Sequence, residues 1–100
     1  MRSRCDNQLT VLGALRAGQL FRNSQWGITL RARYLEPLEF SPRRFVCRFE
    51  TTGHDLTRLQ TLSRQWPRLV LLLDFEIPTQ RIKGIAKAKA GELEQCIISY

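Results

Sequence analysis

Residues 69–100 read LVLLLDFEIPTQRIKGIAKAKAGELEQCIISY, and this stretch decides the fold. An apolar run at 69–73 is followed by alternating apolar and polar residues up to Ile77, which is typical of a β-strand. Pro78 and Thr79 then supply a turn, and alternation resumes over residues 80–89. A second turn at Ala90-Gly91 leads into a last strand. The stretch therefore predicts three strands joined by tight turns.

Charges in this stretch predict how its strands align. With two-residue turns at 78–79 and 90–91, four opposite-charge pairs fall into register: Glu76–Arg81, Asp74–Lys83, Lys89–Glu92 and Lys87–Glu94. Each such pair stabilises a sheet by a few tenths of a kcal/mol, that is about 0.2–1 kcal/mol. We therefore interpret the basic run in residues 81–89 as a largely neutralised, solvent-facing side of the sheet.

The preceding residues predict six further segments. They are a strand at 6–13, a short helix at 14–23, a half-buried strand or extended segment at 26–34, an irregular segment at 35–43, a strand at 45–50 and a helix at 55–65. The last helix has a leucine stripe, a cap at Thr52 or Asp55, and Pro67 as its stop. This order predicts one α+β domain over residues 1–100. Its expected architecture is a ferredoxin-like two-layer sandwich, a largely antiparallel sheet with two helices on one face.

Composition favours an ordinary globular protein. Apolar residues make up 43% of the chain and charged residues 25%, and no apolar run approaches the roughly 20 residues of a membrane span. The first residues lack the apolar segment of a secretory signal, so we expect a cytoplasmic protein that does not enter membranes. Three widely spaced cysteines and one histidine favour neither a disulfide framework nor a zinc site. Cys47 and Cys96 are expected to be buried or half-buried.

One side of the predicted sheet carries apolar residues that two helices on the other side would leave exposed. They are Leu72, Ile85, Cys96, Ile98 and Tyr100. A contiguous exposed apolar patch marks an interaction surface. We therefore expect an interaction protein that forms a homodimer through this face.

A net charge of +7 raises the alternative of a polyanionic partner. Five arginines lie in and between two extended segments, with Tyr34, Phe40 and Phe45 interleaved. They are Arg31, Arg33, Arg43, Arg44 and Arg48. Arginine for phosphate and aromatic rings for base stacking suit single-stranded nucleic acid. A solvated basic face explains the same residues, so the partner predicted here is either nucleic acid or a host protein.

Catalytic patterns are weak. His54 lies beside Asp55 in a turn, where neighbouring side chains point apart, so a dyad that activates Cys47 is disfavoured. Asp6 and Asp74 are the candidates for a small metal-dependent nuclease, but no carboxylate motif accompanies them. The sequence therefore favours a protein without catalysis and without a cofactor.

Two parts of the chain resemble the YubB-like ferredoxin-like domains of plasmids and phages. Residues 4–13, RCDNQLTVLG, match a C-x-N-x-L-x-V-x-G start. The second half of the family pattern is matched by Phe49-Glu50-Thr51, Leu62-Ser63, Trp66-Pro67, Asp74-Phe75-Glu76 and Gly84. The family's longer Trp- and Gly-rich middle insert is reduced here to Trp26-Gly27. The resemblance implies a ferredoxin-like fold and an origin in a mobile genetic element, and it implies no particular activity.

Overall fold

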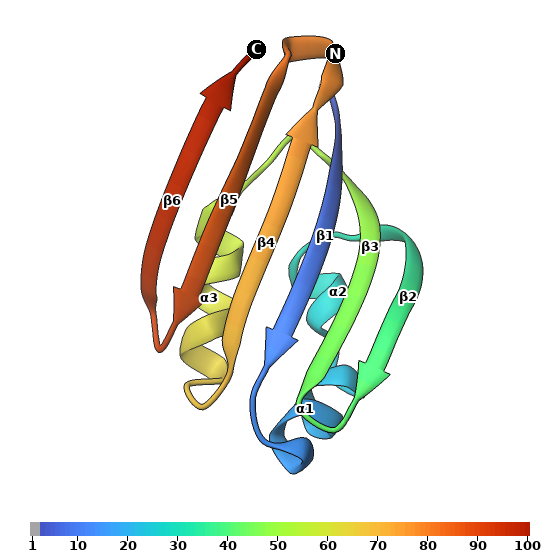
Figure 1. Cartoon of the computed structure of the whole chain (residues 1–100), viewed down its shortest axis with the longest axis vertical. Coiled ribbons are helices and arrows are strands. Elements are labelled where there is room, and N and C mark those ends of the chain that lie inside the picture. The colour runs from blue at the N-terminus through green and yellow to red at the C-terminus, as the bar shows by residue number, and fades with distance from the viewer. Residues whose placement is uncertain (1–2) are drawn as a thin grey trace.

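All six strands lie in one antiparallel sheet in the computed structural model, which describes residues 3–100. In chain order the elements are β1 (Arg4–Leu12), α1 (Leu15–Arg22), α2 (Trp26–Thr29), β2 (Arg33–Ser41), β3 (Arg44–Thr52), α3 (Leu56–Gln65), β4 (Val70–Ile77), a single 3-10 turn (Pro78–Gln80), β5 (Ile82–Lys89) and β6 (Glu92–Ser99). The strand order across the sheet is β2-β3-β1-β4-β5-β6. The N-terminal strand thus lies near the middle, and β2 and β6 form the edges (Figure 1).

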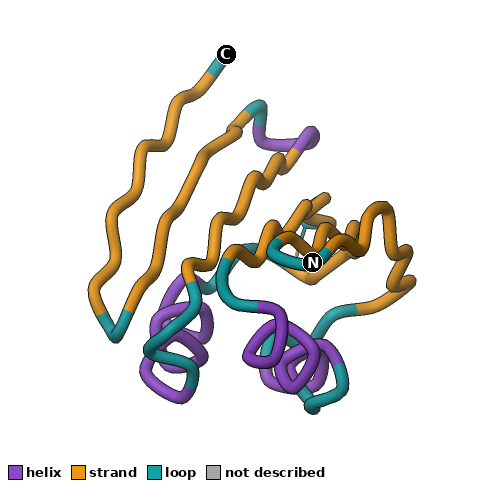
Figure 2. Tube along the Cα trace, turned by 60° about the horizontal axis from the view of Figure 1, so that its bottom comes forward, coloured by secondary structure: helices purple, strands orange, loops and turns teal. Residues whose placement is uncertain are grey.

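The three helices lie on one side of the sheet and leave the other side uncovered (Figures 1 and 2). Strands alternate because successive side chains point to opposite faces. On β1 the residues that face the helices, such as Leu9 and Val11, are buried in the same core cluster as Leu59 and Leu62 of α3. The core therefore lies between the sheet and the helices.

Helix α3 also positions the sheet's last hairpin. Asp55 caps the helix by accepting a hydrogen bond from the Thr57 N–H at 3.0 Å. Further along α3, two side chains bind the turn between β5 and β6. The Gly91 N–H donates to Ser63 Oγ at 2.9 Å, and Gln60 Nε2 donates to the Gly91 carbonyl at 2.7 Å. Ala90 and Gly91 both have positive φ, the geometry of a two-residue hairpin turn. The turn between β5 and β6 is thus held by the helix.

The predicted ferredoxin-like sandwich with two helices is wrong. The chain forms a six-stranded sheet with three short helices, and most of its described residues are in strands. Residues 26–34 were expected to be extended, but residues 26–29 are α2. Trp26 and the C-capping residue Leu30 are one turn apart, and both are buried in the core. Residues 35–43 were expected to be irregular, but most of them belong to β2. An edge strand tolerates Pro37, because its missing N–H is not needed by a second neighbour.

The predicted charge register is half right. Lys89 lies opposite Glu92 and Lys87 opposite Glu94, as expected. Between β4 and β5 the prediction was wrong by two residues: Glu76 lies opposite Lys83, not Arg81. The cause is the connection, which is a 3-10 turn followed by Arg81 in the left-handed region rather than two residues. An even shift keeps every side chain on its predicted face.

None of the helices in the described part of the chain is long and apolar enough to cross a membrane.

Candidate functional site

The face of the sheet opposite the helices, called the helix-free face below, is built of cross-strand rows. Reading from β3 through β1, β4 and β5 to β6, the first row is Glu50, Asp6, Glu76, Lys83 and Ile98; the second is Arg48, Gln8, Asp74, Ile85 and Cys96; the third is Val46, Thr10, Leu72, Lys87 and Glu94. Acidic residues thus fill the middle of the face. The apolar residues of β5 and β6 lie toward one edge.

A groove of about 500 Å³ follows the first and second rows of this face. The twist of the sheet turns β4–β6 away from the plane of β1 and β3 (Figure 2). Ile85, Cys96 and Ile98 form its apolar wall, while Asp74 and Lys83 contribute charge. The groove is open to solvent and mixed in character.

The five predicted interface residues are only partly brought together. Ile85 lies directly opposite Cys96, and Ile98 is the next residue on the same face of β6. Leu72 lies in the third row on β4, diagonal to Ile85 and two strands from Cys96 and Ile98. Cys96 is exposed, so its predicted burial is wrong, whereas Cys47 is buried as expected.

Tyr100 closes the upper corner of the face. Its hydroxyl donates a hydrogen bond to the Glu76 carboxylate, and its ring centre lies near the Arg81 guanidinium (5.6 Å) and the Lys83 ammonium (5.1 Å). The hydrogen bond to Glu76 raises the pKa of Tyr100, with burial and the negative charge of Glu76 acting in the same direction and Arg81 opposing them. The C-terminal end of β6 is thus attached to β4 through a side chain.

This attachment predicts an alkaline transition. Because the pKa of Tyr100 in the folded chain lies above its ordinary value of 10.0, the stabilisation by the hydrogen bond is complete below pH 10 and is lost as the pH rises above it. We expect Glu76→Gln to lower the pKa of Tyr100, since it removes the negative charge. Ultraviolet titration of the phenolate, with Tyr100→Phe subtracted, measures this pKa. An identical titration of wild type and Glu76→Gln would contradict the assignment.

The five arginines of the nucleic-acid hypothesis lie on different surfaces. Arg44 and Arg48 are on the helix-free face, Arg43 is in the turn between β2 and β3, Arg33 begins β2, and Arg31 lies on the helix side. Two of them are engaged: Arg44 pairs with Glu39 at 3.2 Å, and Arg33 donates to Thr52 at 3.1 Å. A single strand of nucleic acid that touched all five would have to pass around the β2 edge.

The three aromatic residues of the same hypothesis are also separated. Phe45 is buried in the core, and Phe40, 44% exposed, has the Arg22 guanidinium over its ring, 4.1 Å from the ring centre. Tyr34 is 78% exposed. The structure therefore does not assemble a series of stacking platforms from these three rings.

The carboxylates of the nuclease hypothesis lie in the middle of the helix-free face. Asp6 is opposite both Glu50 and Glu76, and Arg4 contacts Asp6 at 3.2 Å and Glu50 at 3.5 Å. Like charges in one row destabilise a sheet, and the arginine offsets part of that effect. Within residues 3–100, no group of three or more His, Cys, Asp or Glu side chains is arranged to hold a metal ion.

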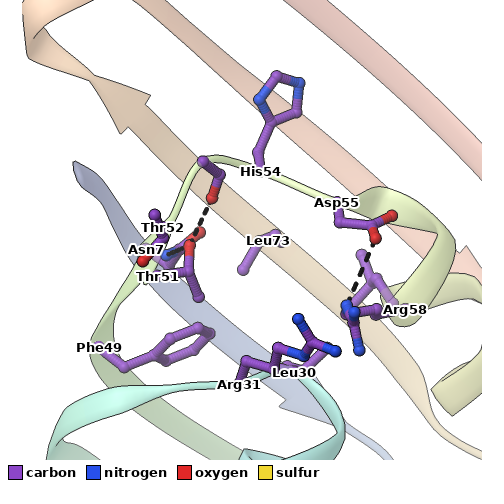
Figure 3. A pocket seen from close by; sticks show the side chains of 12 residues that line it. Asn7, Leu30, Arg31, Phe49, Thr51, Thr52, His54, Asp55, Arg58 and Leu73 are labelled. Atoms are coloured by element: carbon purple, nitrogen blue, oxygen red, sulfur yellow. Dashed lines mark hydrogen bonds and ion pairs between the residues drawn. The ribbon is translucent and has the colours of Figure 1, made fainter. Parts of the chain in front are cut away.

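A pocket on the helix side, called the α3 pocket below, was not predicted from the sequence. It has a volume of about 240 Å³ and lies where α3 begins, beside the connection from α2 to β2 (Figure 3). Its residues are Asn7, Leu30, Arg31, Phe49, Thr51, Thr52, Gly53, His54, Asp55, Arg58, Leu59 and Leu73. One sequence signal could have indicated it: Asn7 is a polar residue on the inward-facing side of an otherwise apolar strand.

Asn7 is held by a small buried network. Its side-chain N–H group donates to the Cys5 carbonyl at 3.1 Å and to Thr51 Oγ1 at 3.0 Å, and the Thr51 hydroxyl donates to the Gly53 carbonyl at 2.7 Å. Burial raises the pKa of the Cys5 thiol, although its hydrogen bond to Thr51 acts in the opposite direction. Burial likewise raises the pKa of Cys47. Both thiols therefore stay protonated at neutral pH.

Comparison of the chain with models of protein families, with curated proteins and with solved structures finds no match. The resemblance to the YubB-like domains thus rests on the residues quoted for it.

Proposed function

We propose that this chain is a binding protein that works as a homodimer, in which the β6 edges of two copies pair to extend the sheet. The observation that carries the proposal is the difference between the two edges of the sheet. Edge strands present unpaired backbone groups that can pair with another chain unless something blocks them. In this molecule one edge is blocked and the other is open.

The β2 edge is blocked. Its pairing with β3 shifts register twice, between Arg33 and Glu36 and between Pro37 and Glu39. Bulges and proline interrupt the regular row of donors and acceptors that an added strand needs. The β6 edge has neither feature: Glu92–Ser99 pairs with β5 without a shift, contains no proline and carries Ile97 and Ile98 exposed.

The geometry of the hairpin tells which backbone groups of β6 are available. The Tyr100 N–H bonds to the Arg81 carbonyl at 2.8 Å, so even-numbered residues of the strand point their backbone groups toward β5. Backbone groups alternate in direction along an antiparallel strand. Leu93, Gln95, Ile97 and Ser99 therefore direct their N–H and C=O groups outward, toward a second chain.

Charge favours an antiparallel arrangement of the two copies. Glu92 and Glu94 lie at one end of the strand, whereas Arg81 and Lys83 lie beside its other end. Antiparallel pairing over residues 92–100 is centred on Cys96 and brings the glutamates of each copy next to the basic end of the partner. Cys96 then faces its own copy across a non-hydrogen-bonded position, where Cα atoms are about 4.5 Å apart.

Oxidative cross-linking tests this arrangement. Two facing Cys96 thiols form one disulfide and pass two protons and two electrons to the oxidant, copper–phenanthroline with oxygen, and their Cα separation suits the bond. We expect a covalent dimer on non-reducing gels. Cys96→Ser should give none, because Cys5 and Cys47 are 0% and 1% exposed.

A matched control places the thiol elsewhere on the same face. The double variant Cys96→Ser/Ile85→Cys carries an exposed thiol one strand inside the edge. Edge pairing predicts no cross-link from this position. Failure of wild type to cross-link, or equal cross-linking of the control, would contradict pairing through β6.

A further inference from the structure

We infer that the α3 pocket binds a small organic anion, with a flat or compact apolar body and one carboxylate or phosphate group. The inference is independent of the proposed dimer, because the pocket lies on the helix side and the β6 edge does not contribute to it. The first support is the division of its lining. Phe49, Leu59 and Leu73 provide an apolar interior, and charged residues are gathered at its mouth. Such sites combine apolar walls with a few placed polar groups.

Two guanidinium groups converge on the mouth of the pocket. Arg31 enters from the connection between α2 and β2, and Arg58 enters from the first turn of α3 (Figure 3). Arg58 also forms an ion pair with Asp55, with 3.3 Å between the Arg58 Nε and an Asp55 carboxylate oxygen. Arg31 has no ion pair and no side-chain hydrogen bond within residues 3–100. With two arginines and one aspartate the mouth has an excess of positive charge, and arginine binds carboxylates and phosphates in a two-pronged manner.

The end of α2 determines where Arg31 lies. Its φ is +56°, in the left-handed region. The Ala32 N–H donates to the Gly27 carbonyl at 2.8 Å and the Arg31 N–H to the Ile28 carbonyl at 3.0 Å, the hydrogen bonds of a helix that ends in a left-handed residue. The backbone of this helix end therefore places Arg31 beside the pocket.

His54 and the threonines complete the mouth. The His54 imidazole stacks on the Phe75 ring with centres 4.9 Å apart, which fixes it beside the start of α3. Thr51 and Thr52 line the strand side, where the Thr51 hydroxyl donates to the Gly53 carbonyl and Thr52 accepts from Arg33. The pocket volume of about 240 Å³ suits a small ligand such as a ring with one anionic substituent.

Isothermal titration calorimetry with four probes tests the inference: phenyl phosphate, benzoate, benzyl alcohol and inorganic phosphate. We expect phenyl phosphate or benzoate to bind, and the comparison of the two identifies the preferred head group. Benzyl alcohol should bind at least about tenfold more weakly for lack of charge. Inorganic phosphate should bind more weakly than phenyl phosphate for lack of the apolar body. Equal binding of either control probe, or no binding of either anion, would overturn the inference.

Variants assign the binding to the pocket. Arg31→Asn keeps a residue that tolerates positive φ, and Arg58→Gln keeps helix propensity, so both should fold, as circular dichroism will check. Each should weaken binding about tenfold. Arg68→Gln, an exposed arginine beyond the end of α3, is the matched control and should change nothing. Equal weakening by Arg68→Gln would mean that general charge, not the pocket, attracts the anion. Ile98→Asp should bind as wild type does, which separates this test from the dimer.

Discussion

Ile98→Asp is expected to convert the dimer into a folded monomer, whereas Ile85→Asp on the neighbouring strand leaves the dimer intact. Both side chains are exposed on the helix-free face, 52% and 57% respectively, so neither change should unfold the chain. They differ in distance from the proposed contact. Ile98 lies on β6 itself, where antiparallel pairing centred on Cys96 brings it opposite Glu94 of the partner subunit. Ile85 lies one strand further in.

The expected effect at Ile98 is large because symmetry doubles it. Replacing the isoleucine removes apolar burial worth roughly 1.5 kcal/mol and sets a carboxylate against another carboxylate. A two-fold axis repeats the loss in the second copy, giving about 3 kcal/mol, or about a hundredfold weaker association. Sedimentation velocity over a range of concentrations measures this. Equal dissociation by Ile85→Asp would indicate that the two sheets pack face to face rather than edge to edge.

Gly84→Ala should destabilise the fold, although the same substitution at Gly18 should not. A Cβ at Gly84 would lie 2.5 Å from the tip of the Phe75 ring and 3.0 Å from the Cys96 carbonyl oxygen. The ring is held between this glycine and His54, so it has little room to shift. Overpacking of this kind costs about 1–3 kcal/mol.

Gly18 supplies the matched control in α1. A Cβ there meets no atom within 4 Å, and alanine favours a helix over glycine by up to about 1 kcal/mol. Urea denaturation of the two variants should therefore give free energies of unfolding that change in opposite directions. A Gly84→Ala protein as stable as wild type would show that Phe75 is not confined as described.

The sequence predicted correctly those elements whose apolar residues recur with a spacing that fits either a helix or a strand but not both. The leucines of α3, its Asp55 cap and the alternation of β4 through β6 all correspond to what the structure shows. The prediction for residues 26–30 was wrong because the spacing of Trp26, Ile28 and Leu30 fits a strand as well as a helix. Only the burial of Trp26 and Leu30 on the same side, which the sequence does not show, distinguishes the helix from the strand. Pro37 led us to expect an irregular segment, since proline disfavours a central strand. An edge strand tolerates it, but that this strand lies at the edge is known only from the order of the sheet.

Sites assembled from distant segments were beyond local patterns. The α3 pocket draws on Asn7, Arg31, Thr51 and Arg58, four segments that meet only because β1 lies between β3 and β4. The arginines proposed for nucleic acid likewise lie on several elements: Arg43 is in the β2–β3 turn, whereas Arg44 begins β3.

The central position of β1 governs the order in which the molecule can form. Among the described strands β1 comes first in the chain, yet one neighbour, β3, begins at Arg44 and the other, β4, begins at Val70. At about 5–20 residues per second, β1 waits several seconds for its second neighbour. The meander of β4, β5 and β6 needs only short loops, which close at low entropic cost. During synthesis β1 therefore has one edge without a partner until β4 has been made, and the half of the sheet that is made last can assemble first.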